Sequence, residues 1–297
     1  MKKKRPPQQT AAASIEKPEE GTASDALAPP EIPTPEDELA HAAHASSPEQ
    51  QAFFQAVGII KGDISWDGDK AFVKIGGNPY QLSYSSTHKR AYDALKKEID
   101  NTGITEQTLI VYPRVTHYPG GKKPYSLGFQ LAGFAGLAAP SREGLQSVLG
   151  DLEFRLCGLW QFIPVCRVPC ISVFKNFNKQ RLEYIKSAPV DKKVNFMKAS
   201  HVPLIWKDAS VQPFRFNPKL EKDTQGKASF VQLKAKFNSE RNIFEFVSLQ
   251  GEPSDSVPSY LKSRKEDKAE AMRAKLASRK AQQKKPSPKP KPMKEKL

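Results

Sequence analysis

The chain has 297 residues with a formal net charge of +15, 38% hydrophobic residues and 25 prolines. This composition excludes a chain that is folded throughout, and it predicts a shorter folded core between disordered ends. No segment approaches the ~18 to 20 apolar residues of a membrane span. The basic start is followed by polar, Pro-rich sequence and not by the apolar region of a signal peptide. We therefore expect a cytoplasmic protein that does not enter a membrane.

The positive charge is concentrated near the end of the chain. Residues 262–297 hold 14 Lys and Arg against 4 Asp and Glu, whereas residues 1–50 hold 5 against 9. A basic chain attracts polyanions, nucleic acid first and anionic membrane surfaces second. We expect this tail to bind nucleic acid without reading its sequence. The alternative is a solubilising or ribosome-adhering extension with no specific target.

The predicted core begins with a block over residues 51–135. We expect strands over 53–64, 71–75 and 80–84, then a helix over 87–101, then strands over 108–112 and 125–134. Asp67-Gly68 and Gly76-Gly77-Asn78 are typical of hairpin turns. Ala91, Leu95 and Ile99 recur at helical spacing, which predicts the helix.

A linker over 136–151, rich in Gly and Ala, precedes a second block over 152–251. There we expect strands over 154–162, 169–174, 193–197, 202–206, 230–237 and 242–249, with a short helix over 181–185. The flanking segments 1–50 and 252–297 are predicted to be disordered, the second one partly helical when bound.

The two blocks look like relatives. "FQAVGII" at Phe54 matches "FRLCGLW" at Phe154, "LIVYP" at Leu109 matches "PLIWK" at Pro203, and "FQLAGF" at Phe129 matches "FVQLKAKF" at Phe230. The matches keep the same order along the chain, which suggests an internal duplication.

The order β-β-β-α-β-β resembles the OB-fold, a five-stranded barrel with a helix between its third and fourth strands. The glycine inside the first strand, Gly58, fits this resemblance because that strand bends to serve both edges of the barrel. The predicted fold class is therefore mainly β with minor α (α+β), in two OB-like small β-barrel units. The second unit departs from the pattern in its weak helix and its Pro-rich middle.

Four segments also resemble a conserved, uncharacterised family of cyanobacterial proteins: "QAFFQAVGIIKGD", "HKRAYDALKKEI", "LIVYPRVTHYP" and "GLWQFIPVCR". The resemblance covers residues 52–250. It implies a bacterial cytosolic setting and no particular activity.

The best candidate contact region is the loop predicted over 113–124. It holds Arg114, His117, Tyr118, Lys122 and Lys123. Between the last two strands of an OB-like barrel, such loops clamp oligonucleotides, with cations on phosphates and aromatic rings on bases. The alternative is a solvated hairpin loop with ordinary surface lysines.

Two further regions carry cations beside aromatic residues. In the second block, Arg215 is predicted to point outward from a strand whose Phe214 and Phe216 pack inward, and Lys219 follows it. In the first block, Phe72 and Lys74 share one side of a strand, where an OB-fold stacks bases. The alternative there is a Phe72 covered by the N-terminal segment.

Metal and catalytic chemistry find little support. Cys157, Cys166 and Cys170 with His201 do not show the paired C-x2-C spacing of common zinc sites, so buried structural thiols are favoured. Neither a phosphate-binding loop nor a nucleophile elbow is present. We expect no enzyme, no cofactor and no small-molecule substrate. The third hypothesis is an enzyme in which two of Asp63, Cys166, Cys170 and His201 lie together in a deep pocket.

The sequence thus predicts a non-enzymatic protein that binds single-stranded DNA or RNA through barrel loops, aided by the basic tail. The competing hypothesis is an assembly factor whose barrels bind a protein partner.

Overall fold

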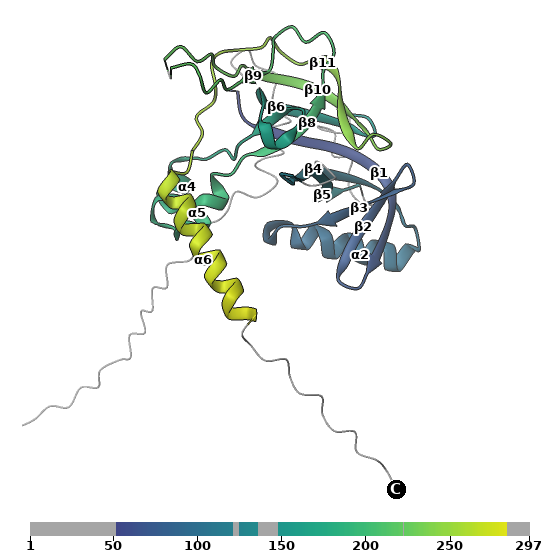
Figure 1. Ribbon diagram of the computed structural model, residues 1–297. Helices are drawn as coiled ribbons and strands as arrows, with labels where there is room; N and C mark the ends of the chain where they lie inside the picture. Colours follow the sequence, from purple (N-terminus) through teal and green to yellow (C-terminus); the bar gives the residue numbers. More distant parts are fainter. Residues whose placement is uncertain (1–51, 121–124, 136–147, 222, 284–297) are drawn as a thin grey trace, which may run out of the picture. The chain divides into compact units, whose positions relative to one another are not determined.

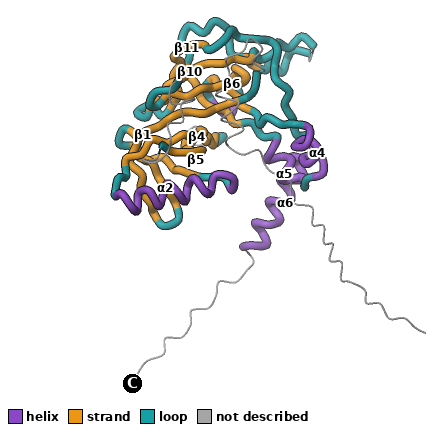
Figure 2. Tube along the Cα trace, turned by 180° about the vertical axis from the view of Figure 1, so that it is seen from behind, coloured by secondary structure: helices purple, strands orange, loops and turns teal. Residues whose placement is uncertain are grey.

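The computed structural model describes residues 52–120, 125–135, 148–221 and 223–283 (Figure 1). Within these ranges the chain is mainly β with a minor share of helix, as the sequence predicted. Figure 2 shows the strands of both blocks in orange, with the helices beside them. The N-terminal segment predicted to be disordered, 1–50, and the last part of the tail, 284–297, lie outside the described residues.

The first block is a closed five-stranded barrel. Its elements are β1 (Gln55–Asp67), β2 (Lys70–Ile75), β3 (Asn78–Ser83), the short turn η1 (Ser86–His88), α2 (Lys89–Thr102), β4 (Glu106–His117) and β5 (Tyr125–Phe134). Hydrogen-bonded ladders run β1–β2–β3–β5–β4 and return to β1, and the β3–β5 ladder alone is parallel. The predicted order of strands and helix is therefore confirmed.

The second block closes in the same way. Its elements are β6 (Glu153–Phe162), η2 (Pro164–Cys166), β7 (Pro169–Val173), α4 (Lys179–Ser187), α5 (Val190–Phe196), β8 (Ser200–Ile205), β9 (Phe214–Arg215), β10 (Phe230–Asn238) and β11 (Ile243–Leu249). The ladders run β6–β7–β8–β11–β10 and back to β6, and the β8–β11 ladder is parallel. The helices here come before the third strand of the ring, whereas α2 follows it.

This ring order shows which strands correspond. β6 takes the place of β1, as the first sequence match implied. β8, however, takes the place of β3 and β10 that of β4, so the matches of Leu109 with Pro203 and of Phe129 with Phe230 are each wrong by one strand. Similar alternation in neighbouring strands produced those matches, since every strand of a small barrel alternates.

The glycine correspondence also shifts. β1 changes its neighbour from β4 to β2 at Asp63, and β6 changes from β10 to β7 at Leu159. The residues just before these points are Gly62 and Gly158. A Cβ on either would lie 2.4 Å or 2.6 Å from a carbonyl oxygen of the neighbouring strand. Only glycine allows this close backbone approach at the bend, so Gly62 is the counterpart of Gly158.

The strand expected over 193–197 is instead the end of helix α5. Val190, Val194 and Met197 are spaced i, i+4 and i+7, and they are half-buried on one side of α5. This helical period outweighs the short alternation that suggested a strand.

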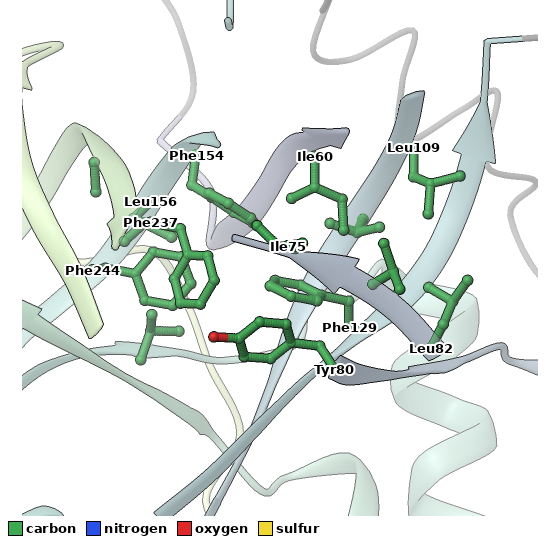
Figure 3. Packing of buried hydrophobic residues seen from close by; sticks show 14 of the residues in the cluster. Ile60, Ile75, Tyr80, Leu82, Leu109, Phe129, Phe154, Leu156, Phe237 and Phe244 are labelled. Atoms are coloured by element: carbon green, nitrogen blue, oxygen red, sulfur yellow. The ribbon is translucent and has the colours of Figure 1, made fainter. Parts of the chain in front are cut away.

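The two barrels share one hydrophobic core. β1 and β6 pair directly from Gln55 to Gly58. Phe129 of the first barrel contacts Phe237 of the second, with ring centroids 5.5 Å apart, and Phe154 stacks on Phe129 at 6.0 Å (Figure 3). The Tyr80 hydroxyl donates to the carbonyl oxygen of Ser239 at 3.1 Å. The core is therefore continuous across the β1–β6 junction.

Segments that flank the second barrel pack on the barrels more than the sequence suggested. At the end of the predicted linker Leu149 is buried against the first barrel, and Leu152, which opens the second block, donates its N–H to the carbonyl of Ile59. Beyond residue 252, Ser254 pairs with Phe230, and the Tyr260 ring lies 5.8 Å from that of Phe54. The tail therefore packs on the barrels as far as Tyr260, and its later helix contacts α5.

The helix α6 (Lys265–Gln283) follows this packed segment. Met272 and Leu276 are exposed on it, in line with the expectation that they give no core-facing side. None of the described helices is long and apolar enough to cross a membrane.

Candidate nucleic-acid interface

Two cations lie over the buried ring of Phe196, and the charge of a third, Arg114, acts on one of them, Lys175. We define the cation cluster as Arg114, Lys175 and Arg181. The Nζ of Lys175 lies 5.4 Å from the centroid of the Phe196 ring, and the guanidinium carbon of Arg181 lies 5.1 Å from it. Both positions are within the range of a cation–π contact. Two cations thus share one aromatic support.

Local structure fixes each member of the cation cluster. Asn178 caps α4 by accepting a hydrogen bond from the N–H of Arg181 at 2.8 Å, which sets the first turn of the helix. Phe196 ends α5 and is 6% exposed. Lys175 follows β7, and Arg114 comes from β4 of the first barrel. The cation cluster is therefore built from both barrels.

Like charges act on the Lys175 ammonium group. Desolvation lowers the pKa of Lys175, and the positive charges of Arg114 and Arg181 lower it further. Within the described ranges, the ion pairs join other residues. The Nε of Arg181 is buried without a described hydrogen-bond partner. An anion bound here would relieve this repulsion.

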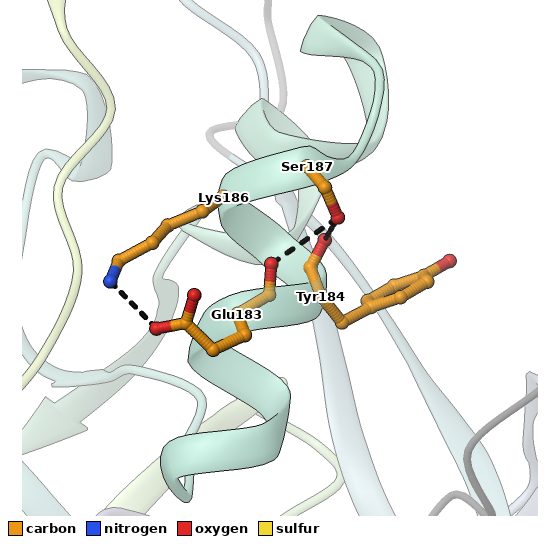
Figure 4. A network of polar contacts seen from close by, with 4 residues as sticks. All are labelled: Glu183, Tyr184, Lys186 and Ser187. Carbon is orange, nitrogen blue, oxygen red and sulfur yellow. Dashed lines mark hydrogen bonds and ion pairs between the residues drawn. The ribbon is translucent and has the colours of Figure 1, made fainter.

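Not every cation of α4 belongs to this group. The Nζ of Lys186 lies 2.7 Å from a carboxylate oxygen of Glu183, and Ser187 bonds the carbonyls of Glu183 and Tyr184 (Figure 4). Lys186 is thus satisfied within its own helix. The ring of Tyr184 extends away from the helix and is 44% exposed.

The first five residues of the predicted loop, 113–117, are strand. β4 continues to His117, so Arg114 and His117 lie in the ladder opposite Gly128 and Tyr125. The strand extends this far because β4 stays paired with β5 after its pairing with β1 ends at Val111. Lys122 and Lys123 lie outside the described residues.

Among the residues of this region, Arg114 and Tyr118 are exposed, and the Tyr118 hydroxyl lies 3.2 Å from that of Ser126. His117 is half-buried, and its Nε2 donates to the carbonyl oxygen of His201 at 2.8 Å. His117 therefore holds the two barrels together, and its role as a contact for nucleic acid has no support in this geometry.

Phe72 and Lys74 lie on the outer side of β2, as predicted. Ala71, Val73 and Ile75 are buried on the other side. Lys74 is exposed directly opposite Asp63 in the β1–β2 ladder. The exposed Asp63 carboxylate therefore belongs to the same part of the sheet, which makes the outer face of β2 less suited to phosphate than the cation cluster.

In the second barrel, Arg215 and Lys219 are both exposed. Arg215 stacks on Phe162, with its guanidinium carbon 4.1 Å from the ring centroid. The expectation that Phe214 and Phe216 both pack inward is wrong for Phe216, which is 63% exposed. β9 has only two residues, so alternation ends before Phe216.

The three cysteines are buried free thiols, and the described residues hold no metal-binding group of His, Cys, Asp or Glu. His201 is linked to Cys170 through Ser172, whose hydroxyl lies 2.7 Å from His201 Nδ1 and 3.9 Å from Cys170 Sγ. Desolvation first, then His117 and Lys198, lower the pKa of His201 to about 4. The imidazole is therefore neutral at neutral pH.

Sequence reasoning missed Lys175, Arg181 and Phe196. A local signal was present, since residues 175–201 hold seven Lys and Arg against two Asp and Glu. The sequence predicts two separate elements here, a short helix over 181–185 and a strand over 193–197, and neither alone indicates that these charges form one cluster.

Neither the family models nor the curated proteins contain a match to this chain. The resemblance to cyanobacterial proteins stays a prediction.

Proposed function

We propose that this protein binds single-stranded nucleic acid without enzymatic activity, and that the cation cluster holds its phosphates. The observation that carries the proposal is the convergence of Arg114, Lys175 and Arg181 from both barrels without a described carboxylate partner. Crowded cations that lack an anion are typical of sites that bind one, and arginine suits phosphate because of its planar, forked donors.

The ring order supports the same proposal. Each block has the strand order of an OB-fold, and OB-folds commonly bind oligonucleotides. Such domains combine a positive groove along the backbone with aromatic rings on which bases stack. Fold likeness alone does not establish function, which is why the proposal rests on the cation cluster.

The basic segments around the barrels give a second contribution. Counterion release makes each Lys or Arg contact with phosphate favourable and salt-sensitive. We infer that the chain beyond Lys262 raises affinity for any nucleic acid, whereas the cation cluster places the strand on the barrels. The proposed setting is the cytoplasm.

Titration of a labelled single strand tests this proposal. One OB-fold covers about 4 to 16 nucleotides, so a strand of about 30 suits two. We expect the full chain to bind at about 50 mM salt and to weaken steeply as salt rises. A chain that ends at Leu261, and so keeps the packing of Tyr260, should still bind. Failure of the full chain to bind at about 50 mM salt would overturn the proposal.

A further inference from the structure

The segment between β8 and β10 presents an aromatic ring to solvent beside two cations. β9 pairs in parallel with the end of β6, which places Arg215 over the Phe162 ring at 4.1 Å. The next residue, Phe216, leaves the strand and is 63% exposed. Lys219 follows, also exposed. We call Arg215, Phe216 and Lys219 the β9 platform.

Side-chain hydrogen bonds hold the loop that follows the β9 platform. Gln225 accepts from the N–H of Asn217 at 3.2 Å, and its amide donates to the carbonyls of Asn217 and Leu220. The Asn217 side chain accepts from the N–H of Lys219 at 3.1 Å. Polar contacts therefore shape this loop, and burial of the Phe216 ring contributes little to it.

An exposed ring beside a hydrogen-bonded loop is well suited to binding. Exposure of the Phe216 side chain forgoes the stabilisation that burial would give it, and the hydrogen bonds of the loop do not depend on the ring. A backbone that is held in place before binding loses little conformational freedom when a ligand stacks on the ring. Neighbouring cations favour a ligand that has both a flat face and negative charge.

We propose that the β9 platform binds one unstacked base of a single strand on Phe216, with Arg215 and Lys219 beside the flanking phosphates. This inference rests on the proposed function and assigns a base contact to a residue that the cation cluster does not include. A paired base in a duplex cannot present its face to the ring, so the contact selects single strands.

Variants of the full-length protein test the β9 platform. Phe216→Ala should weaken single-strand binding about tenfold, since one stacked base contributes about 1 to 3 kcal/mol. Phe216→Trp should retain affinity because it keeps a flat ring. Leu220→Ala removes another exposed apolar side chain, 49% exposed, from the same loop and should change nothing. A hairpin duplex should bind all four proteins equally.

Crosslinking provides a second measurement. A strand with 5-iodouracil in place of thymine should crosslink, on irradiation, to the peptide that contains Phe216. Unchanged affinity of Phe216→Ala with crosslinks elsewhere would overturn the β9 platform but leave the proposed function intact. Equal losses for Phe216→Ala and Leu220→Ala would overturn base stacking in favour of a general apolar contact. If the unmodified protein binds no single strand at about 50 mM salt, the proposed function fails and the β9 platform fails with it.

Discussion

Gly58 lies directly opposite Phe154 in the ladder that joins the two barrels. A Cβ atom on Gly58 would lie 2.2 Å from the Phe154 ring. That ring in turn contacts Phe129 in the first barrel and Phe244 in the second. The junction of the barrels therefore depends on the absence of one side chain.

Replacement of this glycine tests the junction. Gly58→Ala should destabilise the protein by about 1 to 3 kcal/mol, because the methyl group overpacks against a buried ring. Chemical denaturation followed by circular dichroism measures this. The control, Ser65→Ala on the exposed side of the same strand, should have little effect. Equal stability of Gly58→Ala and the unmodified protein would show that Phe154 moves aside freely.

The shared core predicts that the barrels unfold together. Trp66 lies in the first barrel, whereas Trp160 and Trp206 belong to the second. In a Trp66→Phe background, fluorescence therefore reports on the second barrel. Phe129→Leu, in the first barrel, should lower the free energy of unfolding by about 1 to 3 kcal/mol. The midpoint of the fluorescence unfolding curve should fall accordingly.

Phe72→Leu, on the outer side of the first barrel, is the matched control and should leave that midpoint nearly unchanged. If Phe129→Leu alters circular dichroism in a separate, earlier step and leaves the fluorescence midpoint in place, the barrels are independent domains.

His201 makes stability depend on pH. Its pKa falls from 6.5 to about 4 in the folded protein, first because of desolvation and then because of His117 and Lys198. The unfolded chain therefore binds more protons between these values, so stability is lost as pH falls from about 6.5 to about 4, by at most about 3 kcal/mol. His201→Gln should show a shallower loss over this window. An identical pH slope in the variant would contradict the buried neutral imidazole.

The thiols should be unreactive in the folded protein. All three cysteines are buried, so a reagent reaches them only when the fold opens. Burial also raises the pKa of Cys157 to about 11, which keeps its nucleophilic thiolate scarce at neutral or mildly alkaline pH. Iodoacetamide should add to none of the three cysteines in the native protein and to all three in denaturant, as read by intact mass. Ser65→Cys provides an exposed control thiol. Native modification of Cys157 would show that this strand opens readily.

The sequence predicted local structure well and contacts between distant residues poorly. The bounds of β5 were predicted without error, because alternation and turn residues are local signals. The contact of His117 with His201 joins residues 84 positions apart, and no local pattern encodes it. The same holds for Arg114 and Lys175, which meet only because the barrels share a core.

At Phe216 a local pattern gave a wrong prediction. Alternation along the sequence predicted that its ring points inward, but β9 ends after Arg215. Strand length depends on the pairing with β6, which the sequence does not display. Candidate contacts on loops therefore needed the structure, whereas those on β2 did not.

The salt dependence of single-strand binding shows whether the cation cluster holds phosphates. The logarithm of the affinity for a single strand falls linearly with the logarithm of the salt concentration, with a slope of about 0.7 per phosphate contact. Arg114→Gln combined with Arg181→Gln should reduce the slope by about 1.4 and weaken binding, since two contacts are lost. Lys96→Gln combined with Lys97→Gln, on the exposed side of α2, should leave both unchanged. If the two double variants have the same affinity and the same salt slope, the cation cluster is not the phosphate site, and the proposed function is contradicted.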